Sequence, residues 1–366
     1  MMRKRLAILL TGLGAGGAER VVMLLANHWV AQGHEVHIIS FDAPDAPIYF
    51  DVPPTVALHR LDLSHPGLGP LRVLRRLMAL RRVLVKIEPD TLISFLTKNN
   101  VLALLSTWGR SIHTVVCERN NPMRQEANSL WGRLLARLYP LADAIVMQTR
   151  ASLVCLPKGV ESAAFVIPNP IETPTALPPE ESEPKILVAV GRLVSQKGFD
   201  LLIDAFAPIQ DEFSDWQLKI FGDGPLRDSL ASRISACGGS ERIFLAGQTD
   251  TPGAWIREGH AFVLSSRFEG FPNVLGEAMA AGMPVVSFDC PFGPAEMVTD
   301  GVDGLLVPDG DVEELANALR RLLSNRDFRA KLANEARKSS ARFTVPRVAA
   351  QWDALLDTLG ETKRDR

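Results

Sequence analysis

The sequence predicts an α/β protein with two doubly wound domains, and three observations lead to this fold class. Short apolar segments alternate with amphipathic helical segments along almost the whole chain, which is the pattern of parallel α/β sheets. The 366 residues are enough for two domains. A stretch rich in proline and glutamate at 169–184 interrupts the alternation and is typical of a linker.

The expected strands are short runs of apolar and β-branched residues. In the first half they lie at 6–10, 35–41, 91–95, 113–117, 144–147 and 164–167. In the second half they lie at 186–190, 217–221, 242–245, 261–264, 285–287 and 304–307. Apolar residues three and four positions apart predict helices between them, for example at 18–31 and 71–86. We therefore expect an N-terminal domain at 1–168, a second domain at 185–345 and a C-terminal helix at 346–366.

Composition narrows the possible functions. The contents of 46% hydrophobic and 22% charged residues are typical of a globular protein, and the net charge of −2 argues against a nucleic-acid partner. The four cysteines are far apart and form no C-x-x-C pair, so we expect reduced thiols in a cytoplasmic protein and no metal site. No segment has the roughly 18 consecutive apolar residues of a transmembrane helix, and we interpret the apolar N-terminal segment as a first strand rather than a signal peptide.

The segment 265–284, SSRFEGFPNVLGEAMAAGMP, carries the most specific pattern in the chain. A buried strand ends before it, and Gly282 ends a helix expected at 273–281. Glu269 then lies in the turn and Glu277 in the first helical turn, beside backbone N–H groups that can bind a phosphate. Each glutamate alone has an ordinary explanation, because loop carboxylates are often solvated and the helix dipole favours an acid near a helix start. Together they form a site that can hold a nucleotide sugar.

This segment resembles the E-x(7)-E signature of family 4 of the retaining glycosyltransferases, including its Glu-Gly-Phe-Pro-Asn core. The resemblance covers nearly the whole chain and is densest at 186–308. It implies the GT-B architecture, in which two Rossmann-like domains face each other across a cleft. The first domain binds the acceptor, the second binds the donor, and a C-terminal helix crosses back to the first. It also implies that Glu277 holds the ribose, that Glu269 holds the transferred sugar, and that Asn273 and Val274 bind the donor.

Two cations follow the first strand of the second domain, in the segment GRLVSQKG at 191–198. Arg192 and Lys197 can neutralise the charge that a diphosphate leaving group gathers in the transition state. Taken alone, they are better explained as surface cations of a loop. The segment resembles the Gly-Arg-Leu…Lys-Gly phosphate motif of the same family, which implies that both residues bind the donor's phosphates. No metal is required, because these cations take its place.

A glycine-rich loop after the first strand allows two interpretations. Residues 12–17 fit the pattern G-x-G-x-x-G, and Asp42 follows the second strand as a candidate ribose ligand, which favours an NAD-dependent oxidoreductase. The Gly-Gly-Ala-Glu-Arg form at 16–20 resembles instead the first loop of the glycosyltransferases. That resemblance implies that Gly16 and Gly17 approach the donor's diphosphate.

Polar residues after two other strands of the first domain are candidates for the acceptor side. They are Lys98, Asn99, Glu118, Arg119 and Asn120. Many family members have a catalytic histidine where this chain has Glu118 and Arg119, so the general base stays unassigned. The segment DCPFGPAE at 289–296 resembles that of a subgroup that builds lipid-linked or exported bacterial glycans, including transferases of galactose and N-acetylgalactosamine.

The helix expected at 71–86 has an unusually basic face. Five cations cluster on it: Arg72, Arg75, Arg76, Arg82 and Lys86. Leu74, Leu77, Leu84 and Val85 are expected on the opposite face, with Arg81 misplaced among them. Such a helix can rest on anionic lipid headgroups, although a solvated surface helix explains the pattern equally well.

The function that these patterns predict is a retaining hexosyltransferase of polysaccharide or lipopolysaccharide biosynthesis. It moves a hexose or N-acetylhexosamine from a nucleotide sugar, expected to be UDP-linked, to a hydroxyl of a growing lipid-linked cell-surface glycan. Arg192, Lys197 and Glu269 carry the catalysis, with no cofactor besides the donor. We expect a cytoplasmic protein at the inner face of the membrane. The alternatives are a nucleotide-sugar epimerase of the same architecture, an NAD-dependent oxidoreductase and a non-catalytic nucleotide-sugar-binding subunit.

Overall fold

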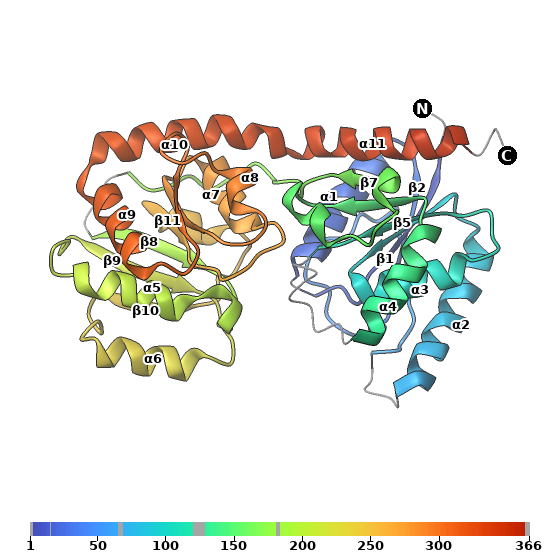
Figure 1. Ribbon diagram of the computed structural model, residues 1–366, viewed down its shortest axis with the longest axis horizontal. Coiled ribbons are helices and arrows are strands. Elements are labelled where there is room, and N and C mark those ends of the chain that lie inside the picture. The colour runs from blue at the N-terminus through green and yellow to red at the C-terminus, as the bar shows by residue number, and fades with distance from the viewer. Residues whose placement is uncertain (1–2, 15, 65–68, 120–128, 181–183, 363–366) are drawn as a thin grey trace. The chain divides into compact units, whose positions relative to one another are not determined.

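The computed structural model describes residues 3–14, 16–64, 69–119, 129–180 and 184–362, and the chain folds into two compact units (Figure 1). The first unit consists of Met1–Pro170 and Val345–Arg366, and the second of Ile171–Thr344. Each unit is built around one parallel β-sheet with helices on both faces. The predicted α/β class with two doubly wound domains is therefore confirmed.

The sheet of the first unit has seven parallel strands in the order β3-β2-β1-β4-β5-β6-β7. Their bounds are β1 Arg5–Leu9, β2 Glu35–Ser40, β3 Ala57–Arg60, β4 Thr91–Phe95, β5 His113–Cys117, β6 Ala144–Met147 and β7 Ala164–Val166. The six predicted strands are all present. β3 was not predicted, because its four residues, Ala-Leu-His-Arg, form no apolar run.

Helices cover both faces of this sheet. One face is packed by α1 (Gly17–Ala31) and α11 (Val345–Thr362), the other by α2 (Gly69–Ile87), α3 (Thr97–Thr107) and α4 (Ser129–Leu138). Trp29 of α1 and Trp352 of α11 meet edge to face with ring centroids 6.1 Å apart. Both His28 and Trp29 bond to the carboxylate of Asp353, at 2.8 and 3.1 Å. The last helix of the chain is therefore an integral part of the first unit.

The second unit has six parallel strands in the order β10-β9-β8-β11-β12-β13. Their bounds are β8 Lys185–Val190, β9 Trp216–Phe221, β10 Ile243–Gly247, β11 Ala261–Leu264, β12 Val285–Asp289 and β13 Leu305–Pro308. Helices α5 (Phe199–Phe206), α6 (Arg227–Ala236) and α9 (Val312–Ser324) pack on one face. The other face holds α7 (Asn273–Ala281), α8 (Pro294–Met297) and α10 (Arg326–Ser340). All six predicted strands are present within two residues at each end.

The structure departs from the predicted faces of α2 at three positions. Leu84 is buried against the sheet as expected, but Leu74 and Val85 are 49% and 50% exposed. Arg76 was expected on the exposed basic face but is half-buried. It donates to the carbonyl of Leu63 at 2.7 Å and lies over the ring of Phe41. The basic and apolar faces of α2 are thus less separated than a helical wheel suggests, since the helix meets the core along a narrow stripe.

Candidate active site

Two predicted catalytic residues meet at the carboxyl ends of the strands of the second unit. β8 and β11 are neighbours in the sheet, so the segments that follow them lie side by side. Lys197 ends the 3-10 turn after β8, and Glu269 lies in the loop after β11. Nζ of Lys197 is 2.7 Å from Oε1 of Glu269, and the two side chains are only 19% and 7% exposed. The fold therefore places a largely buried ion pair where the sequence predicted a diphosphate site.

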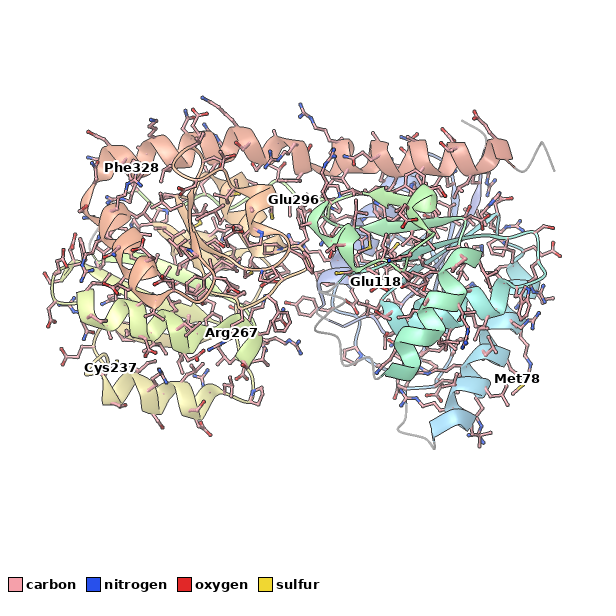
Figure 2. All side chains as sticks on the ribbon, in the orientation of Figure 1. Met78, Glu118, Cys237, Arg267, Glu296 and Phe328 are labelled. Carbon is pink, nitrogen blue, oxygen red and sulfur yellow. The ribbon has the colours of Figure 1, made fainter. Side chains whose placement is uncertain are left out.

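Arg267 connects the loop after β11 to the loop after β8, and it was not among the predicted site residues. Its backbone N–H donates to the carbonyl of Gln196 at 2.8 Å, and its guanidinium donates to the carbonyl of Ser195 at 2.8 Å. The guanidinium also holds the carboxylate of Asp200 through two bonds of 2.8 and 2.6 Å (labelled in Figure 2). This pairing lowers the pKa of Asp200 and raises that of Arg267. The available signal was the position of Arg267, two residues before Glu269.

The two loops approach so closely that one position requires glycine. Gly198 has a φ of 61°, and a Cβ there would lie 2.0 Å from the carbonyl oxygen of Ser265. The hydroxyl of Ser265 donates to the carbonyl of Lys197 at 2.9 Å, and the amide of Gln196 donates to the carbonyl of Phe268 at 3.0 Å. The backbone on both sides of the ion pair is therefore fixed before any ligand binds.

Glu277 is buried in α7, but its position in the helix differs from the prediction. The helix begins at Asn273, so Glu277 is its fifth residue and the first turn contains no acid. Stabilisation by the helix dipole is confined to the first turn and does not explain this residue. The residue is only 4% exposed. Asn273 and Val274 are the first two residues of α7, where the backbone N–H groups point out of the helix rather than to a carbonyl of the same helix.

Arg192 is not joined to this cluster. It follows Gly191 directly after β8 and is exposed. The next residue is fixed, because the N–H of Leu193 donates to the carbonyl of Asp223 at 2.9 Å. Of the three predicted catalytic residues, the structure thus brings Lys197 and Glu269 into contact and leaves the Arg192 side chain in solvent.

In the first unit, Glu118 lies directly after β5 and is 4% exposed (labelled in Figure 2). Its carboxylate accepts hydrogen bonds from Thr97 at 2.8 Å, from Asn100 at 3.2 Å and from the hydroxyl of Tyr139. Burial, followed by the charge of Glu118, raises the pKa of Tyr139 well above its usual value. These bonds tie α3, β5 and the 3-10 turn Tyr139–Leu141 together, which favours a structural role for Glu118.

Arg119, also buried at the end of β5, is 6% exposed. One guanidinium nitrogen donates to Asn169 at 2.5 Å, and the group lies 4.7 Å from the ring of Phe95 and 5.8 Å from that of Trp352. Its Nε and Nη2 have no hydrogen-bond partner in the part of the chain that the structure describes. Burial lowers the pKa of Arg119, and the thiol of Cys117 opposes this shift.

The remaining acceptor-side candidates differ in their surroundings. Lys98 is exposed near the start of α3. Asn99 is buried and donates to the hydroxyl of Thr11 at 3.1 Å, which links it to the loop after β1. Asn120 lies outside the described residues.

The glycine-rich loop leads from β1 into α1. Gly16 is the residue before the helix and Gly17 is its first residue. The carboxylate of Asp42 accepts from the N–H of Leu13 at 3.2 Å and from Arg60 at 2.9 Å. Asp42 is therefore engaged in holding the loop, which disfavours a role as the ribose ligand of a dinucleotide.

Three further properties concern the described residues as a set. They contain no group of three or more histidine, cysteine or acidic side chains that could hold a metal ion. None of the helices in these ranges is long and apolar enough to cross a membrane. The four cysteines all lie within these ranges and are free thiols.

Comparisons with known proteins match both units. The family model described as Glycosyltransferase Family 4 matches residues 15–174, and that described as Glycosyl transferases group 1 matches residues 175–339. The chain is 30% identical to a Campylobacter jejuni N-acetylgalactosamine-N,N'-diacetylbacillosaminyl-diphospho-undecaprenol 4-alpha-N-acetylgalactosaminyltransferase, over 98% of this chain and 100% of that protein.

Two other similarities differ in how much of the other protein this chain covers. An exopolysaccharide phosphotransferase of Streptomyces coelicolor is also 30% identical over 99% of this chain, which spans only 41% of that longer protein. The crystal structure of Anabaena HepE in complex with UDP and glucose superposes with a TM-score of 0.79 at 19% identity, covering 97% of this chain and 100% of that one. The chain thus belongs to the glycosyltransferases of the group 1 and family 4 type, and its fold is GT-B.

Proposed function

We propose that the protein is a retaining hexosyltransferase that transfers a sugar from a UDP-linked donor to a hydroxyl of a lipid-linked glycan. The observation that carries the proposal is the Lys197–Glu269 ion pair, which is largely buried at the carboxyl ends of β8 and β11. Two comparisons support the substrates. The Campylobacter relative is named for an acceptor on diphospho-undecaprenol and for N-acetylgalactosamine transfer, and HepE was crystallised with UDP and glucose.

In the proposed reaction, the bond between the anomeric carbon and the diphosphate oxygen breaks while a bond to the acceptor oxygen forms on the same face. The acceptor's proton passes to the departing phosphate oxygen. Lys197 has three N–H donors, so it can keep Glu269 while it binds a phosphate oxygen. Fixed donors aimed at developing negative charge are among the largest contributors to catalysis. Arg192 adds a second cation from the solvent side of the same loop.

The other donor contacts follow from the positions of the residues in each unit. Glu277 is assigned to the ribose hydroxyls, since a buried carboxylate is a strong hydrogen-bond acceptor. Asn273 and Val274 start α7, where N–H groups favour an anion. In the first unit, donor binding by Gly16 and Gly17 stays a prediction: they stand at the start of α1, and the N–H of Gly16 donates to the carbonyl of Gly14 at 3.0 Å.

The donor assignment is tested by thermal unfolding with UDP, GDP, ADP and NAD. A ligand that binds only the folded state raises the apparent stability by RT ln(1 + [L]/Kd). We expect a shift with UDP that Glu277→Ala reduces, since lost hydrogen bonds to a charged group weaken binding by about 10- to 150-fold. A shift with NAD alone would overturn the assignment. The anomeric configuration of the product, read by NMR, tests retention.

The proposed lipid-linked acceptor agrees with the surface of α2. This helix contains no acidic residue, and its exposed apolar side chains are Leu71, Val73, Leu74, Met78 and Val85. Met78 extends from the outer side of α2 (Figure 2). Exposed cations lie beside them: Arg75, Arg81, Arg82 and Lys86. Apolar side chains next to cations suit the interface of an anionic membrane. We assign α2 to the inner face of the cytoplasmic membrane.

Vesicle co-sedimentation tests this contact. The wild type should bind vesicles that contain phosphatidylglycerol and should not bind vesicles of phosphatidylcholine alone. The double variant Arg75→Glu with Arg82→Glu should lose this binding. A control with the same charge change, Lys331→Glu with Arg347→Glu on α10 and α11, should bind like the wild type. Equal binding by both double variants would exclude α2 as the contact.

A further inference from the structure

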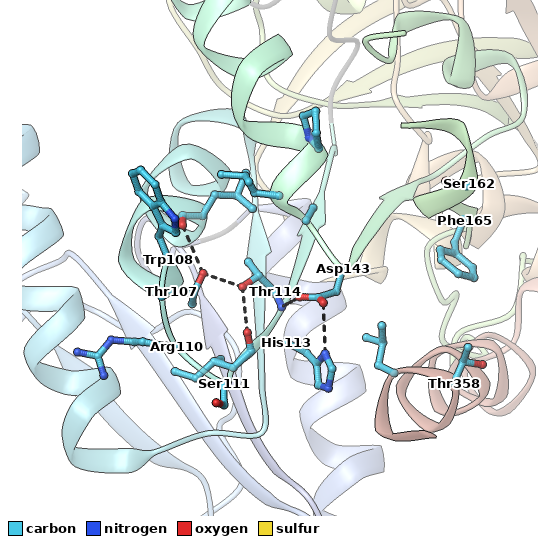
Figure 3. Close-up of a pocket in the computed structure, with 17 residues that line it drawn as sticks. Thr107, Trp108, Arg110, Ser111, His113, Thr114, Asp143, Ser162, Phe165 and Thr358 are labelled. Atoms are coloured by element: carbon cyan, nitrogen blue, oxygen red, sulfur yellow. Dashed lines mark hydrogen bonds and ion pairs between the residues drawn. The ribbon is translucent and has the colours of Figure 1, made fainter. Parts of the chain in front are cut away.

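A cavity of about 950 Å³ lies at the amino ends of the strands of the first unit. His113 begins β5, Asp143 immediately precedes β6, and Ser162 lies just before β7 (Figure 3). Glu118 follows the other end of β5. Five residues of strand separate the two ends by about 16 Å. The cavity therefore lies at the opposite edge of this sheet from Glu118 and from the glycine-rich loop after β1, and it is large enough for a small ligand.

The lining of the cavity is apolar at its sides and polar in its middle. Trp108, which is 69% exposed, lies on one side and Phe165 on the other (Figure 3). Between them, His113 contacts Asp143 at 3.4 Å, and the N–H of Thr114 donates to Asp143 at 2.8 Å. Such a lining offers flat apolar surfaces together with donors and acceptors.

The charge of the lining limits the class of ligand. Among the described residues that line the cavity, three side chains are ionisable: Arg110, Asp143 and His113. One cation and one anion make the lining close to neutral, so it matches neither a diphosphate nor a multivalent cation. The uncharged ligand that combines apolar faces with many hydroxyl groups is an oligosaccharide, whose C–H faces pack on aromatic rings.

We propose that this cavity is a second glycan-binding site that holds a neutral oligosaccharide segment of the acceptor away from the transfer site. Trp108 provides the stacking surface. Asp143 accepts hydrogen bonds from the hydroxyl groups of the glycan, and Ser162 can donate or accept them. The identity of the glycan rests on the proposed function. A second site on one chain raises the effective concentration of a long acceptor at the first without changing the reaction.

The test measures binding of chitohexaose and maltohexaose to the full chain by calorimetry. Both probes are neutral and carry neither lipid nor nucleotide. Trp108→Ala should weaken binding about tenfold, and Ser162→Trp, which fills the cavity from an exposed position, should abolish it. Leu177→Ala is the matched control, since Leu177 is 68% exposed in the second unit and should leave binding unchanged. Thermal unfolding confirms that each variant is folded.

Several results would overturn the proposal. They are no binding of either oligosaccharide by the wild type, wild-type binding by both cavity variants, and a loss of vesicle binding rather than oligosaccharide binding in Trp108→Ala. Transfer kinetics separate this proposal from the proposed function. Trp108→Ala should raise KM about tenfold for a long acceptor and leave a single-sugar acceptor unaffected. Oligosaccharide binding without any transfer would refute the proposed function alone, and normal transfer without such binding would refute the second site alone.

Discussion

A double-mutant cycle on Lys197 and Glu269 separates the structural from the catalytic contribution of their ion pair. The single variants are Lys197→Met and Glu269→Gln, which remove charge and keep most of the side-chain volume. The two atoms are 2.7 Å apart, and the side chains are 19% and 7% exposed. Because so little water reaches the pair, removing one partner leaves the other charge poorly solvated.

The expected magnitudes follow from this burial. Breaking a fully buried pair costs about 3–5 kcal/mol, and the partial exposure of Lys197 places this case near 2–3 kcal/mol for either single variant. The double variant should be more stable than the sum of the single losses predicts, with a coupling energy of about 1–3 kcal/mol. Turnover should fall about 100- to 1000-fold in Lys197→Met, since Lys197 is assigned to the leaving diphosphate.

Urea unfolding gives the stability cycle, and transfer assayed with the proposed substrates, a UDP-linked sugar and a lipid-linked glycan, gives turnover. Lys338 and Glu335 on α10 form a control pair with the same distance of 2.7 Å but with 62% and 36% exposure. Their coupling should stay below about 0.5 kcal/mol. A coupling energy near zero for Lys197 and Glu269 would refute their burial as a unit, and wild-type turnover in Lys197→Met would refute its catalytic assignment.

Three further predictions concern the surroundings of the site. Arg267→Ala should destabilise the second unit at neutral pH. Because Arg267 lowers the pKa of Asp200 in the folded state, that contribution is complete above the usual Asp pKa of about 3.9 and is lost as the pH falls through the folded value, so urea unfolding of wild type and variant should converge in acid. Arg119→Met should change the free energy of unfolding by less than about 1 kcal/mol, since two buried guanidinium nitrogens have no partner among the described residues; a loss above about 3 kcal/mol would contradict this. Gly198→Ala should lower the melting temperature and weaken UDP binding, because its Cβ would lie 2.0 Å from the carbonyl of Ser265; an unchanged thermal shift would show that the loop can relax.

Local patterns determined the elements of the fold. Strands of a parallel sheet are covered on both faces, so they are continuous apolar runs that can be recognised one at a time. The exception is β3, whose sequence Ala-Leu-His-Arg forms no apolar run, unlike β7 at the other edge of the same sheet. Helix α7 was predicted with its observed bounds, because Gly282 adopts a φ of 74° at its end.

The sequence by itself determined two α/β domains and the segments that carry the candidate site, because apolar periodicity, glycine turns and strand ends are local properties. The tertiary structure alone decided which of those residues meet. Lys197 contacts Glu269 across 72 positions because β8 and β11 are neighbours in the sheet, and no local pattern encodes that order. It also decided that Leu74 is exposed and that Glu118 is enclosed by three side chains, since burial depends on what packs against a residue rather than on its own chemistry.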